Sequence, residues 1–257
     1  MLKKRLIAVL IIRDGRVVQS VQFKHTNSIH YDPVHAIECF NKWAVDEIVI
    51  LNVSREASSR DHFAETVKRI SQKCFVPLSV GGWITDMDYG IRLLQSGADK
   101  LVVNTILADD PKLVQKMSKW LGKQCIVASM DIQRDKKEKA TIRVDRGQRS
   151  IHHSPAEWAK RAEKLGAGEI FFNSIDCDGN RQGYDLKELK KVCAAVEIPV
   201  IAFGGVFRWQ HLVEGIHAGA DAVGVANLFH YTEHATVKAK RHMAEAGIHV
   251  RSEGQGF

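Results

Sequence analysis

Two copies of one pattern decide the fold: Gly97-Ala98-Asp99-Lys100-Leu101-Val102-Val103-Asn104 and Gly219-Ala220-Asp221-Ala222-Val223-Gly224-Val225-Ala226. In each copy, a glycine suited to ending a helix precedes a short apolar run typical of a buried strand. The second copy begins 122 residues after the first, and the same shift relates residues 46–50 to 168–172. Near the start of the chain the shift is 120 and pairs Ala8 with Ala128. A repeat of this length predicts one half-unit present twice.

Strand and helix signals outside this repeat predict the rest of the architecture. Apolar runs indicate strands at 6–12, 47–52, 78–81, 100–104, 125–131, 169–174, 200–203 and 222–226. Asp32-Pro33 and Ser154-Pro155-Ala156-Glu157 mark helix starts, the second with a capping-box pattern. Polar segments at 16–31 and 134–153 are typical of hairpins or loops. We therefore predict a single-domain (β/α)8 TIM barrel, with half-barrels at about 1–120 and 121–257; an open doubly wound sheet is the alternative.

Bulk properties narrow the functional class. A chain of 257 residues can form one large α/β domain, and no apolar run approaches the ~20 residues of a membrane span. The apolar run from Leu6 stops at Arg13-Asp14-Gly15 without a cleavage site, which favours a first strand over a signal peptide. The five cysteines show no metal-type spacing, and the net charge of +7 forms no dense basic stripe. We expect a cytoplasmic protein without metal or cofactor that binds neither nucleic acid nor membrane.

Candidate phosphate-binding residues follow strands in both halves. Gly-Gly pairs at 81–82 and 204–205 can expose backbone N–H groups to an anion, and a short helix from Asn227 would point its N-terminus at the same place. The alternative explanation for the pairs is a tight turn. Trp83 is the repeat mate of Gly205 and puts a large indole where close approach of the backbone to an anion is needed; the alternative explanation is a hydrophobic plug. The predicted phosphate-binding set is Gly82, Asn104, Thr105, Gly179, Gly204, Gly205, Ala226 and Asn227.

Two carboxylates near the same mouth are candidate acid–base groups. Asp131 ends the fifth strand and Asp178 follows the sixth, although either aspartate could instead cap a loop. The repeat mate of Asp131 is Ile11, which cannot transfer a proton. Only one carboxylate is therefore expected on this axis of the barrel.

The opposite end of the barrel carries charge where aliphatic residues are usual. Glu47, Lys100, Glu169 and Ala222 are register-matched on alternate strands, and Arg5 enters at the base of the first strand. Two acids and two bases can pair, as buried charges must. The ring is either a structural ion-pair plug or a polar gate for a small molecule on the barrel axis.

These residues resemble a known family, HisF, the cyclase subunit of imidazole glycerol phosphate synthase. The resemblance runs through 4–8, 14–18, 32–33, 46–47, 97–100 with 104–105, 166–169, and 178–179 before 183–185. It implies that a glutaminase subunit releases ammonia, which crosses the barrel and reacts with a bis-phosphorylated substrate. It also implies that Arg5, Glu47, Lys100 and Glu169 form the ammonia gate and that the glutaminase docks on the N-terminal face, including Asp99.

Departures from the family pattern lie at the other mouth. The resemblance implies a catalytic aspartate where this chain has Ile11, with Asp131 as the second one. It also implies a lysine at Gln19, glycine at Trp83, a small hydroxyl residue at Phe203, threonine at Asn173 and serine at Asn227.

Three hypotheses follow from the intact gate and the altered mouth. The combination is similar to HisF-like glycosyl amidation-associated proteins of surface-polysaccharide clusters, which implies a conduit that delivers ammonia to a third protein, an amidotransferase. The second hypothesis is a histidine-pathway cyclase with a relocated acid. The third is an unrelated phosphosugar isomerase, which would not bind a glutaminase.

Overall fold

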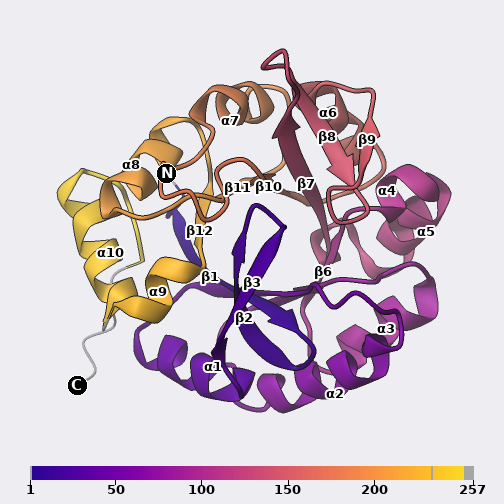
Figure 1. Cartoon of the computed structure of the whole chain (residues 1–257), viewed down its shortest axis with the longest axis horizontal. Helices are drawn as coiled ribbons and strands as arrows, with labels where there is room; N and C mark the ends of the chain where they lie inside the picture. Colours follow the sequence, from indigo (N-terminus) through magenta and orange to yellow (C-terminus); the bar gives the residue numbers. More distant parts are fainter. Residues whose placement is uncertain (1, 233, 252–257) are drawn as a thin grey trace.

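Eight parallel strands close into a barrel in the computed structural model, which describes residues 2–232 and 234–251. Strand β1 pairs with both β4 and β12, and β10 pairs with both β7 and β11, so the sheet has no open edge on this path. The helices form an outer ring around it (Figure 1). The closed barrel confirms the predicted TIM fold over the open sheet. The barrel strands are β1 (Arg5–Arg13), β4 (Glu47–Asn52), β5 (Leu78–Gly81), β6 (Lys100–Val103), β7 (Ile126–Arg134), β10 (Glu169–Ser174), β11 (Val200–Phe203) and β12 (Ala222–Val225).

Helix starts carry the expected caps. The Ser154 and Glu157 pair forms the predicted capping box, and Asp32 accepts a hydrogen bond from the Val34 backbone. The expected elements leave 105–124 without a helix, whereas the structure has α4, α5 and η1 there; Asp110-Pro111 caps α5. The helices are α1 (Pro33–Lys42), α2 (Ser59–Ser71), α3 (Met87–Gln95), α4 (Ile106–Asp109), α5 (Pro111–Leu121), η1 (Lys123–Cys125), α6 (Pro155–Lys164), α7 (Leu186–Cys193), α8 (Trp209–His217), α9 (Asn227–Tyr231) and α10 (Ala235–Glu245).

Each half of the chain adds a hairpin beyond its first barrel strand. The hairpin β2 (Arg16–Val21) and β3 (His25–His30) continues from β1, and β8 (Ala140–Val144) with β9 (Arg149–Ile151) continues from β7. In the view of Figure 1, the first hairpin crosses in front of the barrel centre. Both therefore rise from the carboxyl ends of the strands, where the loops of such barrels build their sites.

Side-chain alternation divides the core in two. On β1, Leu6, Ala8 and Leu10 belong to the larger cluster between sheet and helices. Ile7 and Val9 point the other way, into a second buried cluster inside the barrel. The inward face of each strand therefore sets the content of the barrel axis.

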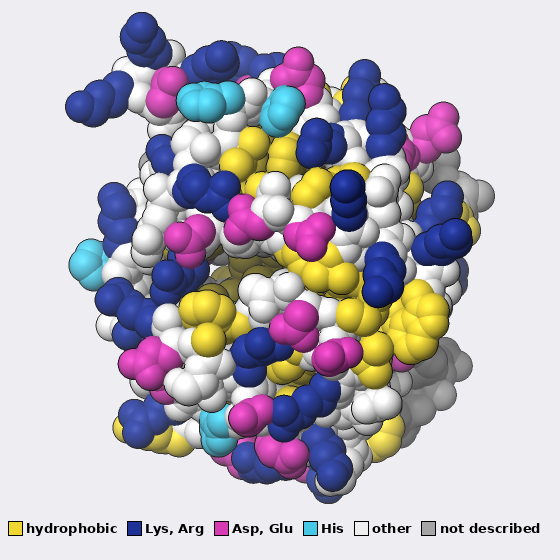
Figure 2. All heavy atoms as spheres, turned by 90° about the vertical axis from the view of Figure 1, so that its right-hand side faces the viewer, with side chains coloured by type: hydrophobic (Ala, Val, Ile, Leu, Met, Phe, Trp, Pro, Cys, Tyr) yellow, Lys and Arg dark blue, Asp and Glu magenta, His cyan; other side chains and the backbone are white. Residues whose placement is uncertain are grey.

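The surface mixes charges of both signs. Basic and acidic side chains are interspersed on the face shown in Figure 2. All five cysteines are free thiols. Within residues 2–232 and 234–251, no group of side chains is arranged to hold a metal ion, and no helix has the length and apolarity to cross a membrane.

Candidate functional site

A ring of four charged side chains closes the amino-terminal end of the barrel. Arg5 Nη1 donates to Glu47 Oε1 at 2.7 Å, and Arg5 Nη2 contacts Glu169 Oε1. Lys100 Nζ lies 3.0 Å from Glu169 Oε2 and 3.4 Å from Glu47 Oε2. Glu47 and Glu169 are only 7% and 5% exposed. The structure thus brings together the three charged side chains that the sequence placed in one layer, Glu47, Lys100 and Glu169, with Arg5 from the base of β1.

Above this ring the barrel axis is largely apolar, with the buried Ser79 and Ser129 as polar members of the inward face. The second buried cluster fills it with aliphatic side chains and two phenylalanines, Phe171 and Phe203, whose ring centroids are 5.0 Å apart. Such a lining admits a neutral molecule far more readily than an ion. The residues of this cluster include Ile7, Val9, Val49, Val102, Val127 and Ile201.

A cavity of about 460 Å³ opens at the carboxyl ends of the strands, and Asp131 is at its base. Its carboxylate accepts hydrogen bonds from Asn173 Nδ2 at 2.9 Å and Asn104 Nδ2 at 3.0 Å. Burial raises the pKa of Asp131 from 3.8 to about 7; the Asn173 hydrogen bond opposes this rise and the charge of Asp178 adds to it. Asp131 can therefore exchange a proton near neutral pH.

Asp178 lines the same cavity from the loop after β10. Its carboxylate accepts a hydrogen bond from Ser20 Oγ at 2.7 Å, which ties the loop to the β2–β3 hairpin. Burial raises the pKa of Asp178 to about 6, against hydrogen bonds from Ser20 and the Phe23 and Gln22 backbones. Two carboxyl groups with raised pKa values thus share one cavity, which is a frequent property of functional sites.

Ile11 faces this cavity from β1. The side chain is 6% exposed and belongs to the apolar cluster inside the barrel. Its strand neighbours on the inward face, Ile7 and Val9, are apolar as well. As the sequence predicted, β1 offers no carboxylate opposite Asp131.

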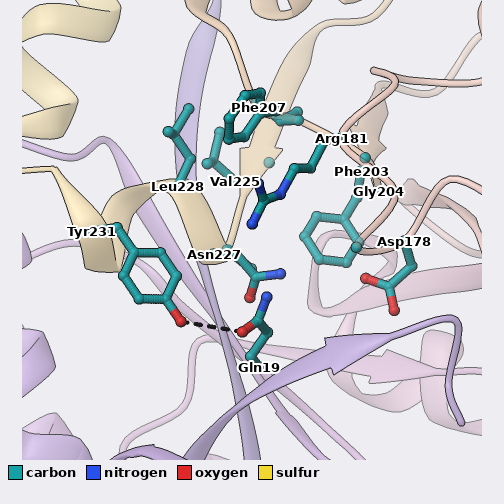
Figure 3. Close-up of a pocket in the computed structure, with 15 residues that line it drawn as sticks. Gln19, Asp178, Arg181, Phe203, Gly204, Phe207, Val225, Asn227, Leu228 and Tyr231 are labelled. Carbon is teal, nitrogen blue, oxygen red and sulfur yellow. Dashed lines mark hydrogen bonds between the residues drawn. The ribbon is translucent and has the colours of Figure 1, made fainter. Parts of the chain in front are cut away.

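A second, smaller pocket of about 90 Å³ lies beside Asp178 (Figure 3). Its wall includes Gly204 and Gly205, with φ of +97° and +92°, conformations that glycine adopts readily. In Figure 3 the side-chain ends of Arg181, Asn227 and Gln19 approach one another inside the pocket. The Tyr231 hydroxyl donates to Gln19 Oε1 at 3.1 Å. Of the predicted phosphate set, Gly179, Gly204, Gly205, Ala226 and Asn227 meet here.

Arg181 is the cation of this small pocket, and the sequence patterns did not identify it. Its guanidinium carbon stacks 4.8 Å from the centroid of Phe207, and within the described part of the chain it forms no ion pair or hydrogen bond. Phe203 contributes to both pockets and stands between them. An anion in the small pocket would therefore meet an unneutralised positive charge.

The part of the barrel mouth that the first half of the chain forms differs from the small pocket of the second half. Gly82, Asn104 and Thr105 line the large cavity, but the Asn104 side chain is committed to Asp131, and Thr105 Oγ1 accepts a hydrogen bond from the Asp145 backbone. Trp83 has a φ of +59° and donates from Nε1 to the Ser54 carbonyl at 2.8 Å. The indole thus occupies space at the turn that corresponds to Gly205 in the other half.

Comparisons with known proteins identify the family to which this barrel is related. The model of the histidine biosynthesis protein family matches residues 5–235. The chain is also 37% identical to the imidazole glycerol phosphate synthase subunit HisF of Methanopyrus kandleri, over 97% of this chain and 98% of the relative. The chain belongs to the HisF family. The HisF subunit from Bacillus cereus is 37% identical as well, with 98% of this chain and all of the relative covered.

Membership of the HisF family confirms the resemblance inferred from the sequence motifs. Both relatives carry the name of the histidine-pathway synthase, so they favour the second hypothesis, a cyclase, over the first. The narrower link to surface-polysaccharide proteins has no support from them. Four of the positions at which the sequence departs from the expected HisF pattern line the large cavity: Ile11, Trp83, Asn173 and Phe203.

Proposed function

We propose that this HisF-family chain is the ammonia-using subunit of a glutamine-dependent synthase, and that it joins ammonia to a phosphorylated substrate in the cavity around Asp131. The observation that carries the proposal is the arrangement along one axis: a charged ring, an apolar interior, and a cavity with two carboxyl groups. Ammonia is small, and its neutral form can cross an apolar interior that excludes ions. The ring at the entrance is its gate.

A glutaminase subunit is the proposed source of the ammonia, docked on the face that the ring closes. Asp99 is exposed there and accepts a hydrogen bond from the Leu78 backbone at 2.7 Å. Leu2, Phe75 and Trp120 are exposed large apolar side chains on segments that lead into strands, so they lie toward the same end of the barrel. In the proposed complex the partner would cover these apolar side chains.

In the proposed reaction Asp131 and Asp178 move protons, and the small pocket holds one phosphate of the substrate. With pKa values of about 7 and 6, both carboxyl groups are near the range in which an acid–base catalyst works at neutral pH. The Gly204-Gly205 turn and Arg181 supply N–H donors for the phosphate. The names of the relatives favour imidazole glycerol phosphate synthesis as the reaction.

One specific observation favours a second candidate function. Ile11 replaces a carboxylate in the cavity wall with an aliphatic side chain, and a missing acid–base group typically costs ~10²–10⁴ in rate. The chain would then serve as a conduit that passes ammonia to a separate acceptor enzyme, as in the amidation of sugars.

The decisive experiment gives the purified chain the histidine-pathway cyclase substrate with ammonium chloride and measures imidazole product. Turnover by the unaltered chain supports the cyclase. In that case Ile11→Asp should change the turnover rate little. If the unaltered chain is inactive only because it lacks this carboxyl group, Ile11→Asp should raise the turnover rate ~10²–10⁴-fold. Ile11→Asn is the matched control, because it adds polarity without a titratable proton.

A glutaminase assay separates the conduit from an unrelated activity. A chain without cyclase turnover that still binds a HisH-type glutaminase, and raises its glutamine hydrolysis, is a conduit. If the chain neither turns over the substrate nor binds the glutaminase, the proposed function is wrong.

A further inference from the structure

Asp131 is a buried carboxyl group without a cation to balance its charge. It is 9% exposed, and within residues 2–232 and 234–251 it forms no ion pair. The charged group that acts on it, Asp178, carries the same sign. Ionisation in such a place is unfavourable unless hydrogen bonds stabilise the anion. The donors that surround the carboxylate therefore decide whether it can titrate near neutral pH.

Two amides supply these donors from the strands on either side of β7. Asn173 on β10 pairs in register with Asp131 and donates from Nδ2 to Oδ1 at 2.9 Å. Asn104, directly after β6, donates from Nδ2 to Oδ2 at 3.0 Å. Each oxygen of the carboxylate has its own N–H donor, so the two amides fix the plane of the carboxyl group as well as favouring its charge.

Asn173 is the stronger of the two partners. It is 2% exposed, and its hydrogen bond to Asp131 is buried. Asn104 is half-buried, and its Nδ2 also lies 3.3 Å from the Ser129 carbonyl oxygen. A hydrogen bond to a charged group gains strength where water is excluded. The hydrogen bond from Asn173 accordingly lowers the pKa of Asp131 against the effect of burial.

The Asn173 amide is oriented by Asp131. Its Oδ1 lies toward Gly204, where an added Cβ would be 3.1 Å away, and accepts no hydrogen bond from residues 2–232 and 234–251. The opposite orientation would place Oδ1 against the carboxylate, with two acceptors facing each other. Because a buried acceptor without a donor costs stability, the side chain is placed for Asp131 rather than for the packing of β10.

We propose that Asn173 is a positioning residue, which holds the Asp131 carboxylate in a fixed plane and keeps it ionisable at neutral pH. The inference rests on the proposed function, in which Asp131 moves a proton, and adds a residue that acts through it. Asn173 is also one of the four cavity residues at which the chain departs from the expected HisF pattern.

The pKa of Asp131 in the isolated chain tests this role without substrate or glutaminase. The probe is the Asp131 13Cγ resonance in protein labelled at aspartate, identified by its loss in Asp131→Asn. Asn173→Leu keeps nearly the same side-chain shape and removes the donor. We expect this variant to raise the measured pKa of Asp131 by about one pH unit, the effect of one hydrogen bond to a charged group.

Asn52→Leu is the matched control. Asn52 lines the same cavity and is 6% exposed, but its amide forms hydrogen bonds with Ser59 and Ser54 instead of Asp131. The same replacement there removes as much polarity from the cavity wall. It should therefore move the pKa of Asp131 by less than about 0.3 pH unit.

The unaltered chain supplies a readout that does not depend on the folding of a variant at Asn173. An N–H group that donates to a carboxylate changes its proton resonance when the carboxylate is protonated. The Asn173 Nδ2–H resonances should therefore move with pH at the same midpoint as the Asp131 13Cγ resonance. This movement should disappear in Asp131→Asn.

Three results would overturn the role of Asn173: an Asp131 pKa that Asn173→Leu leaves unchanged, an equal shift in Asn52→Leu, or Asn173 amide resonances that do not follow the titration of Asp131. None of these measurements needs turnover, so the failure of this role is distinguishable from the failure of the proposed function. The expected pKa shifts without any cyclase turnover would refute the cyclase alone.

Discussion

Replacing Asp131 by asparagine should change how the stability of the protein depends on pH. In the folded chain the pKa of Asp131 is about 7, against an ordinary value of 3.8, chiefly because the carboxyl group is buried. Between about pH 4 and 7 the folded state therefore binds more protons at this site than the unfolded state does. By linkage, this carboxyl group lowers the free energy of unfolding as pH rises through that window.

The difference in pKa sets the size of the effect. About three pKa units correspond to at most about 4 kcal/mol of stability lost between about pH 4 and 8. The asparagine side chain does not titrate. The free energy of unfolding of Asp131→Asn should therefore rise relative to that of the unaltered chain by roughly 2–4 kcal/mol over this range. The gain should level off above about pH 8, once Asp131 is ionised in both states.

Urea unfolding followed by circular dichroism at several pH values measures this difference directly. Asp178→Asn is the comparison, and its gain should be complete at a lower pH because the pKa of Asp178 is about 6. A stability difference between the unaltered chain and Asp131→Asn that stays constant from about pH 4 to 8 would show that Asp131 titrates as an ordinary carboxyl group.

Three further changes test the ring, a turn and the small pocket. Lys100→Met leaves two buried glutamates facing one arginine and should destabilise the fold by about 3 kcal/mol in urea, whereas Lys4→Met, at a partly exposed ion pair, should lose less than about 1 kcal/mol. Gly82→Ala should lower the unfolding free energy by about 1–3 kcal/mol, because φ is +111° and the new Cβ would lie 2.3 Å from the Asn52 carbonyl oxygen. Arg181→Gln should weaken inorganic phosphate binding about tenfold by calorimetry, and unchanged binding would remove this guanidinium from the phosphate site.

The repeat is what made the barrel and its ring predictable. Register carried from one half to the other located Glu47, Lys100 and Glu169 on one layer, and strand 169–174 has the bounds that its apolar run indicated. The expected elements lack helix α5, although Asp110-Pro111 carries the same N-cap and proline signal as Asp32-Pro33. Local signals and periodicity are enough for such features.

The arrangement of side chains at the carboxyl-terminal mouth of the barrel depends on backbone and side-chain geometry that no sequence pattern predicts. Arg181 lies in the small pocket because its backbone has a φ of +63° and its side chain stacks on Phe207, which comes from another loop. Asp131 is held by two amides, Asn173 and Asn104, that turn their NH2 groups toward it from neighbouring strands. Inward alternation from Glu169 predicts Asn173 as a lining residue, but not that its amide donates to Asp131.

The shared contacts of the charged ring also affect how easily the ring can open. Each glutamate contacts both cations, and each cation contacts both glutamates. Any one of the four contacts can break while every member keeps an opposite charge beside it. In its proposed role as a gate, the ring would therefore let one small molecule pass without leaving any of its four charged side chains without an opposite charge.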